Sequence, residues 1–192
     1  DFLSIEEIDT LIAAIDLSKA EGQRNKAILE TLYSCGLRVS ELVELRLSNL
    51  YFDEGFMRVI GKGNKERLVP MSNKAIKEIT NYKESNRNHI NPQKGSEDIV
   101  FLNRRGKKLT RVMIFTIIKQ TAIIAGVTKN ISPHTFRHSF ATHLVDGGAD
   151  LRAVQDMLGH ESITTTEIYT HLDKHHLRDT IMMFHPRSKS KK

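Results

Sequence analysis

The hydrophobic pattern of this chain changes its period once, between two long stretches of helical repeat. Residues 47–71 (LSNLYFDEGFMRVIGKGNKERLVPM) carry short apolar runs separated by turn residues at 53–55 (DEG) and 61–64 (GKGN). Short runs joined by tight turns predict three antiparallel strands. On both sides of this segment, apolar residues recur every three to four positions, which predicts helices. We therefore expect a mainly α fold with a small three-stranded antiparallel sheet.

Local capping signals predict where several helices begin and end. Ser4 and Glu7 have the spacing of a capping box at the start of the first helix. Gly36 is suited to a left-handed C-cap, Pro133 to a first helical turn, and Asp150 to an N-cap. The predicted helices cover residues 3–16, 24–35, 39–45, 73–86, 110–125, 133–145, 151–158, 164–171 and 175–184.

Length and composition limit the class of protein. The 192 residues can bury a substantial core, and we interpret residues 1–192 as one domain. No apolar run reaches the roughly 18 residues of a membrane span, so we expect no membrane association. The single cysteine, Cys35, fits a reducing compartment, and we expect a cytoplasmic protein. Because the chain begins at Asp1 without a methionine, we expect it to be part of something longer.

The charge balance suits a polyanionic partner without proving one. Lys and Arg number 29 against 23 Asp and Glu, which gives a formal net charge of +6. Many basic proteins bind no nucleic acid, so the balance alone does not decide.

Two motifs each allow a structural or a functional interpretation. In GLRVSEL (36–42), Arg38 and Glu41 could form a surface ion pair, or Glu41 could orient a guanidinium toward a phosphate. In GKGNKERLVP (61–70), Lys62 could be a solvated hairpin tip or a mobile ammonium group. The glycine spacing of this second motif fits neither a dinucleotide fingerprint nor a Walker A loop.

A third motif lies in HTFRHSFATHL (134–144). His134, Arg137 and His138 stand at i, i+3 and i+4, which predicts that they share one helix face. The two histidines have the spacing of a zinc-binding pair, but Thr135 stands where the general base of HExxH belongs. We therefore expect neither a metal ion nor a cofactor. Tyr169, in TEIYTHL, could by itself be an ordinary core tyrosine.

Taken together, these motifs resemble those of the tyrosine recombinase (phage-integrase) family, in particular its bacterial Xer branch, over essentially the whole chain. The family's pattern is an arginine, a hairpin lysine, an H-x-x-R pair, a histidine or tryptophan, and a tyrosine. It is met here by Arg38, Lys62, His134, Arg137, His160 in LGHESITTTEIYTHL, and Tyr169. The resemblance implies the fold of the family's catalytic domain and the cutting and rejoining of DNA.

The residue types also suit that chemistry by themselves. A tyrosine hydroxyl that attacks a phosphodiester builds negative charge on the non-bridging oxygens, and forked guanidinium donors can offset it without a metal. We assign this role to Arg38 and Arg137, with His160 as a further donor and Glu41 behind Arg38. Tyr169 would become linked to the 3′-phosphate and leave a free 5′-hydroxyl.

Two further residues would handle protons. Tyr169 has a reference pKa near 10 and needs a proton acceptor as it attacks, for which His134 is the preferred candidate. Lys62 is the candidate acid that protonates the departing 5′-oxygen.

The resemblance also implies partners. We expect double-stranded DNA held mainly through its phosphates, and other recombinase subunits in a tetrameric synapse. Family members usually carry an N-terminal DNA-clamping domain, which we expect to be missing from this chain. The helix HHLRDTIMMFHP resembles the segment that docks onto a neighbouring subunit. In a monomer it could fold back instead, because Leu177, Ile181, Met182 and Phe184 favour burial.

Several functions share these features. The preferred one is site-specific recombination that resolves chromosome or plasmid multimers. A mobile-element integrase and a type IB topoisomerase would use the same tyrosine chemistry. A DNA-binding module without catalysis is a fourth alternative, against which the complete set of six residues argues.

Overall fold

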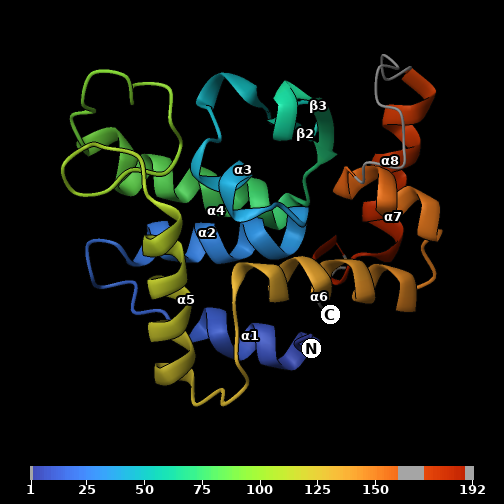
Figure 1. Cartoon of the computed structure of the whole chain (residues 1–192), viewed down its shortest axis with the longest axis horizontal. Helices are drawn as coiled ribbons and strands as arrows, with labels where there is room; N and C mark the ends of the chain where they lie inside the picture. The colour runs from blue at the N-terminus through green and yellow to red at the C-terminus, as the bar shows by residue number, and fades with distance from the viewer. Residues whose placement is uncertain (1, 160–170, 189–192) are drawn as a thin grey trace.

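Helices make up most of the structure and lie close to where the hydrophobic periodicity predicts them. The computed structural model describes residues 2–159 and 171–188 (Figure 1). The α-helices of these residues are α1 (Ile5–Ala13), α2 (Gly22–Cys35), α3 (Val39–Val43), α4 (Asn73–Ser85), α5 (Arg111–Ala125), α6 (Pro133–Asp146), α7 (Leu151–Leu158) and α8 (His171–Phe184).

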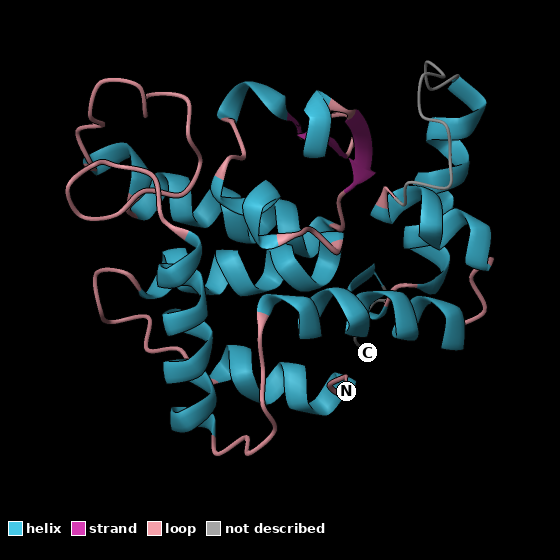
Figure 2. Ribbon diagram, viewed as in Figure 1, coloured by secondary structure: helices cyan, strands magenta, loops and turns pink. Residues whose placement is uncertain are grey.

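The predicted sheet is present and small. Strands β1 (Leu50–Tyr51), β2 (Phe56–Ile60) and β3 (Glu66–Pro70) pair antiparallel in the order β1-β2-β3. A short 3-10 turn, Lys62–Asn64, joins β2 to β3. Figure 2 shows these strands as a minor element at one edge of the helical body. The expectation of a mainly α fold with one three-stranded antiparallel sheet is confirmed.

Two hydrophobic clusters hold the elements together. The larger surrounds α2, which packs against α4 and α6 and contributes the buried side chains of Ile28, Leu32 and Cys35. The smaller joins α6, α7 and α8 through residues such as Phe140 and Met157. Cys35 is fully buried in the larger cluster. Among the described residues, none of the helices combines the length and apolarity needed to cross a bilayer.

The capping signals mark several helix ends. Ser4 and Glu7 form the predicted capping box, and Gly36 ends α2 at φ 66°. Several boundaries differ from the predicted ones: α1 is shorter, α2 begins at Gly22, and α3 ends at Val43 instead of continuing to residue 45. The backbone beyond it pairs with another segment, where the Leu47 N–H donates to the Asp98 carbonyl (2.7 Å) and the Val100 N–H to the Leu45 carbonyl (2.9 Å). Long-range pairing therefore replaces the last helical turn.

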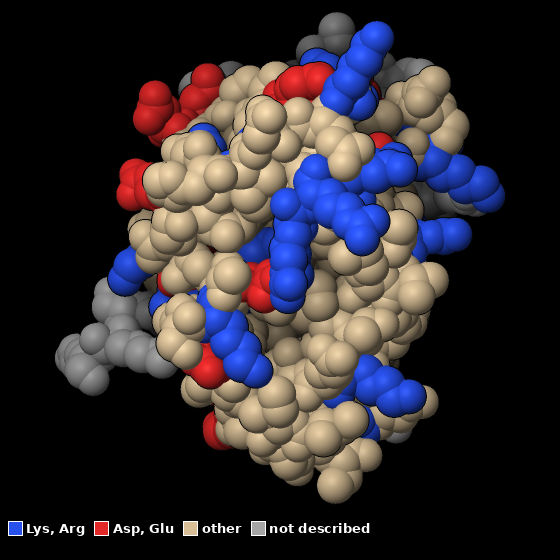
Figure 3. All heavy atoms as spheres, turned by 90° about the vertical axis from the view of Figure 1, so that its left-hand side faces the viewer, with Lys and Arg blue, Asp and Glu red and all other residues tan. Residues whose placement is uncertain are grey.

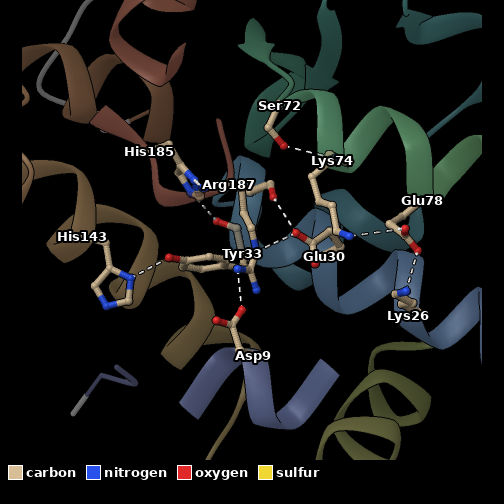
Figure 4. A network of polar contacts seen from close by, with 12 residues as sticks. Asp9, Lys26, Glu30, Tyr33, Ser72, Lys74, Glu78, His143, His185 and Arg187 are labelled. Atoms are coloured by element: carbon tan, nitrogen blue, oxygen red, sulfur yellow. Dashed lines mark hydrogen bonds and ion pairs between the residues drawn. The ribbon is translucent and has the colours of Figure 1, made fainter. Parts of the chain in front are cut away.

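The C-terminal segment folds back onto its own chain. Leu177 and Ile181 of α8 are buried, as predicted for a monomer, and α8 starts at His171 instead of residue 175. The predicted helix over 164–171 lies outside the described residues except for its last position. A buried polar network drawn in Figure 4 joins His185 and Arg187, just after α8, to α1 and α2.

Two side chains of this end segment make the contacts. The ring Nε2 of His185, which is fully buried, lies 3.3 Å from the carbonyl oxygen of Tyr33. Arg187 donates through Nε to Glu30 (2.8 Å) and pairs with Asp9 (2.5 Å) (Figure 4). His185 and Arg187, just after α8, are therefore part of the folded body.

This burial predicts a pH-dependent stability. Burial lowers the pKa of the His185 imidazole to about 3, and it lowers that of His143 below its usual range. Since the unfolded chain binds protons at these groups near pH 6.5, the free energy of unfolding should fall as the pH drops from 7 to 5. Below pH 6, each such histidine contributes a slope of up to about 1.4 kcal/mol per pH unit.

Urea denaturation at several pH values measures that slope. His185→Gln should flatten it, because glutamine carries no titrating ring. A histidine exposed on the surface, His89, provides the matched control as His89→Gln. An unchanged slope in His185→Gln would contradict the assignment.

Candidate active site

Two arginines from distant parts of the sequence meet at one backbone oxygen. Arg38 occupies the N-cap of α3 and Arg137 lies on α6. The Leu158 carbonyl accepts a hydrogen bond from Arg38 Nη1 (3.4 Å) and another from Arg137 Nη2 (2.7 Å). Arg137 Nη1 also donates to the carbonyl of Gly36 (2.7 Å), at the end of α2. The ends of α2 and α7 thus converge on Arg137.

These two guanidinium groups differ in exposure. Arg137 is 8% exposed, whereas the Arg38 side chain is 43% exposed. Burial and the nearby charges of Arg38 and Arg67 lower the pKa of Arg137 to about 10, although Glu41 opposes the change. Arg137 therefore stays protonated at neutral pH. The cluster carries excess positive charge in a partly desolvated place, which favours an entering anion.

Glu41 contacts Arg38 as the sequence predicts, but it also has a stronger partner. Its Oε1 accepts from the Arg38 backbone N–H (2.8 Å), and its Oε2 lies 3.6 Å from Arg38 Nη1. Arg67 holds both carboxylate oxygens, with Nη2 donating to Oε1 (2.9 Å) and Nη1 to Oε2. Burial alone would raise the pKa of Glu41, yet the hydrogen bond and charge of Arg67 outweigh it and lower that pKa.

Arg67 is the residue of this cluster that sequence reasoning missed. It is 5% exposed, and its Nε donates to the Met157 carbonyl (2.8 Å) in the last turn of α7. A signal was available in the alternation of β3, where Arg67 shares a face with buried Val69. A charge on a buried face requires a partner, so this position predicts a buried carboxylate nearby.

Two glycines allow the lysine hairpin and the end of α7 to approach this ion pair. A Cβ on Gly61 would lie 3.2 Å from Glu41 Oε2. Gly159 has φ 70°, and a Cβ there would lie 2.9 Å from Arg67 Cδ. Lys62 follows Gly61 directly and is exposed in the turn between β2 and β3. The hairpin that carries Lys62 is therefore anchored beside Glu41.

The side chains of His134, Arg137 and His138 on α6 differ in their exposure to solvent. His134 is exposed in the first turn, while Arg137 points inward. His138 is also exposed, and its ring centroid lies 5.9 Å from that of Phe2. His134 and His138, at positions i and i+4, are thus both exposed on α6, as their spacing predicts, whereas Arg137 at i+3 is buried. Among the described residues, no group of three or more His, Cys, Asp or Glu could hold a metal ion.

His160 and Tyr169 lie outside the described residues, so their predicted roles stay predictions. The sequence still places His160 two residues after Leu158, whose carbonyl joins the two arginines, and Tyr169 two residues before the start of α8.

Comparison with known proteins decides the family. Residues 1–176 match the phage integrase family. The chain belongs to the phage integrase family. The tyrosine recombinase XerD of Staphylococcus aureus (strain N315) is 47% identical over 191 residues, which cover 98% of this chain and 63% of the relative. This integrase-family chain therefore spans less than two thirds of the length of the curated relatives it matches.

Solved structures of recombinases share the fold of this integrase-family chain. XerA recombinase superposes with a TM-score of 0.76 at 31% identity, over 97% of this chain and 65% of the other. XerH site-specific recombinase, in a pre-cleavage complex with its difH substrate, superposes with a TM-score of 0.73 at 26% identity, over 83% of this chain and 47% of the other. The expected recombinase catalytic-domain fold is confirmed.

One face of this integrase-family chain is rich in basic side chains. The loop before α5 and the first residue of that helix, residues 104–111, carry five exposed cations, and we call this segment the basic loop. Its cations are Arg104, Arg105, Lys107, Lys108 and Arg111. Lys and Arg gather in the middle of the face shown in Figure 3, the side of the molecule on which this loop lies. Clusters of this kind suit contacts with phosphates.

Proposed function

We propose that this chain is the catalytic domain of a site-specific tyrosine recombinase that acts on double-stranded DNA. The observation that carries the proposal is the convergence of Arg38 and Arg137 on the Leu158 carbonyl. It sets two forked cations at the end of α7, two residues before His160 in the sequence. The 47% identity to a tyrosine recombinase XerD supports the same activity.

The reaction we propose is a reversible transesterification. The Tyr169 hydroxyl attacks the phosphorus, and a 3′-phosphotyrosyl bond forms as the bond to the 5′-oxygen breaks. Arg38, Arg137 and His160 stabilise the charge that develops on the non-bridging oxygens. Because the phosphoester is exchanged and not hydrolysed, a 5′-hydroxyl can reverse the reaction without ATP.

Two residues manage the protons in this scheme. His134 accepts the proton of Tyr169, and its exposed position in the first turn of α6 keeps it accessible. Lys62 donates a proton to the departing 5′-oxygen, from an exposed hairpin turn.

As the biological role, we propose the resolution of chromosome or plasmid multimers in the cytoplasm. The support is the similarity to proteins named XerD, XerA and XerH, the last of these solved with its difH substrate.

Covalent capture tests the activity directly. A pool of duplexes with a randomised core and a nick beside it traps the enzyme, because the short fragment that carries the 5′-hydroxyl diffuses away. We expect a protein–DNA adduct, resistant to denaturant, whose DNA-linked peptide contains Tyr169. EDTA should leave the yield unchanged. An adduct at another residue, or none, would refute the proposal, and relaxation of supercoils without strand exchange would favour a topoisomerase.

The role of Lys62 predicts a specific chemical rescue. Lys62→Ala should slow cleavage by about 100-fold, because an unprotonated 5′-oxygen is a poor leaving group. A substrate with sulfur in place of that 5′-oxygen should restore most of the rate, since a thiolate leaves without a proton. Lys65→Ala, in the same hairpin and also exposed, is the control and should cleave both substrates normally. A Lys62→Ala defect of equal size on both substrates would rule out the acid role.

We further propose that α8 docks onto a neighbouring subunit in a tetrameric DNA complex. In the free chain, the contacts of Arg187 with Asp9 and Glu30 are made within one molecule. The same surfaces would exchange between neighbours on DNA.

Cross-linking distinguishes the two arrangements. A chain with Asp9→Cys and Arg187→Cys is treated with a short bismaleimide. The native Cys35 does not interfere, because it is fully buried and burial raises its thiol pKa to about 12. We expect links within one chain in the free protein and links between chains after addition of DNA with two sites. Links confined to single chains in both samples would exclude the exchange.

A further inference from the structure

The buried Arg67 links three parts of the site that are far apart in sequence. It lies on β3, a few residues after the exposed Lys62 turn. Its two Nη atoms grip Glu41 of α3, and its Nε donates to the Met157 carbonyl of α7. All three nitrogen atoms of its guanidinium group are thus used on the protein itself. The planar fork is occupied by protein partners, which argues against direct contact with DNA.

The partners of Arg67 are the groups that position the other two arginines. Glu41 accepts from the backbone N–H of Arg38 (2.8 Å). Met157 directly precedes Leu158, whose carbonyl accepts from both Arg38 and Arg137. A displacement of Arg67 would therefore move the acceptor of each catalytic guanidinium together with the base of the lysine hairpin.

We infer that Arg67 is a positioning residue that couples the Lys62 hairpin to the two phosphate-binding arginines. This inference rests on the proposed recombinase activity and adds to it a residue outside the six of the family pattern. Arg67 touches no reacting atom. It acts by fixing Glu41 and the last turn of α7 in one relative arrangement, so that Arg38, Arg137 and Lys62 address the same phosphate.

Close packing around Arg67 supports a positional role over a purely stabilising one. Gly159 approaches its Cδ so closely that a Cβ would lie at 2.9 Å, and a Cβ on Gly61 would lie 3.8 Å from its Nη1. The backbone at Gly61 and at Gly159 therefore packs closely against the Arg67 side chain on two sides. By contrast Arg58, on β2, pairs with Glu66 across 3.5 Å, and both of these side chains are partly exposed to solvent.

The first test compares cleavage at saturating DNA in Arg67→Lys, Arg67→Gln and the control Arg58→Gln. We expect both Arg67 variants to lose about 100-fold in the rate of adduct formation, since small misplacements of catalytic groups cost this much. Their affinity for DNA should stay close to that of the unchanged chain, so the substitutions should lower the rate of adduct formation and leave binding unchanged. Arg58→Gln should cleave normally. Normal cleavage by Arg67→Gln would overturn the inference.

Loss of folding has to be separated from loss of position. Arg67→Gln leaves a buried carboxylate without its main partner, which destabilises the protein. The double variant Arg67→Gln with Glu41→Gln removes that unpaired charge and should recover most of the thermal stability. We expect cleavage to stay low in this double variant. Recovery of cleavage in step with stability would show that Arg67 serves folding alone and would overturn the inference.

The pH dependence of the cleavage rate gives a further test, because a change in stability alone would not alter it in the way described next. Glu41 is faced by Arg38 from its own helix, by Arg67 from β3 and by Arg137 from α6. In Arg67→Gln, the Arg67 charge no longer offsets the effect of burial on Glu41, so the pKa of Glu41 should rise. Cleavage should therefore decline further as the pH is lowered toward mild acidity. The double variant should lack this decline, because glutamine does not titrate. Identical acid limbs in both variants would contradict the coupling through Glu41.

Hydrogen exchange keeps the inference testable even if the proposed activity fails. The Gly61 N–H donates to the Lys65 carbonyl (2.7 Å) within the hairpin, and the Gly159 N–H to the Asp156 carbonyl (3.2 Å) at the end of α7. In Arg67→Gln, exchange should quicken at both places together. Absence of adducts with the unchanged chain would refute the recombinase proposal alone, whereas unchanged exchange at both places would refute the coupling.

Discussion

Tyr169→Phe is expected to form no covalent adduct with nicked DNA. The substitution removes one oxygen, the atom that we propose attacks the phosphorus. The phenylalanine ring offers no nucleophilic atom in its place. Binding should persist, because we propose that the phosphate contacts come from cations such as Arg38, Arg137 and those of the basic loop, which the substitution leaves in place. Adduct yield on a denaturing gel and DNA affinity by fluorescence anisotropy measure the two effects separately.

The control for this substitution is Tyr51→Phe. Tyr51 is 38% exposed on β1 and has no role in the proposed chemistry, so its variant should form adducts at the normal rate. Covalent product in Tyr169→Phe would mean that a different side chain is the nucleophile. Loss of DNA binding in the same variant would point to a structural role for the hydroxyl.

Arg137→Ala should lower the rate of cleavage by about 1,000-fold. A single preorganised donor to the developing charge is worth about 100- to 1,000-fold, and Arg137 supplies a full charge from a position that is 8% exposed. Arg137→Lys should restore little of this, because one ammonium group cannot reach the Gly36 and Leu158 carbonyls with the geometry of a fork. Single-turnover cleavage at saturating DNA is the measurement.

The folding cost of Arg137→Ala has to be measured alongside. The substitution removes a donor from the buried Gly36 carbonyl and leaves the Leu158 carbonyl with Arg38 as its remaining side-chain donor. It should cost about 1–3 kcal/mol of stability, which urea denaturation detects. Arg152→Ala, on the exposed side of α7, is the matched control and should change neither cleavage nor stability. Cleavage by Arg137→Ala at the normal rate, in protein shown to be folded, would remove Arg137 from the mechanism.

Local signals predicted much of the fold, because the physics that they report is local. The capping box of Ser4 and Glu7 and the left-handed Gly36 depend only on neighbouring residues. The end of α3 was not predictable in this way, since it depends on backbone pairing of residues 45–47 with 98–100, some fifty positions away. The position of α8 likewise depends on tertiary burial. Its apolar residues predicted that the helix would be buried, but not against which surface.

The candidate site divides along the same line. Spacing within single motifs pointed to Arg38, Lys62, His134 and Arg137, but it could not show which of them meet. Arg67 escaped notice because its meaning lies in a pairing with Glu41, 26 residues earlier, and in a carbonyl 90 residues later. Motif reasoning finds the residues that carry chemistry more readily than those that hold them in place.

The shared Leu158 carbonyl has a consequence for the entropy of the reaction. Long arginine side chains normally lose about 2 kcal/mol of rotamer freedom when they are fixed. Here the hydrogen bonds to backbone oxygens restrict both guanidinium groups during folding, before any DNA arrives. The loss of side-chain entropy therefore lowers the folding stability of the free protein instead of the affinity for DNA. A bound phosphate then meets donors that need little rearrangement.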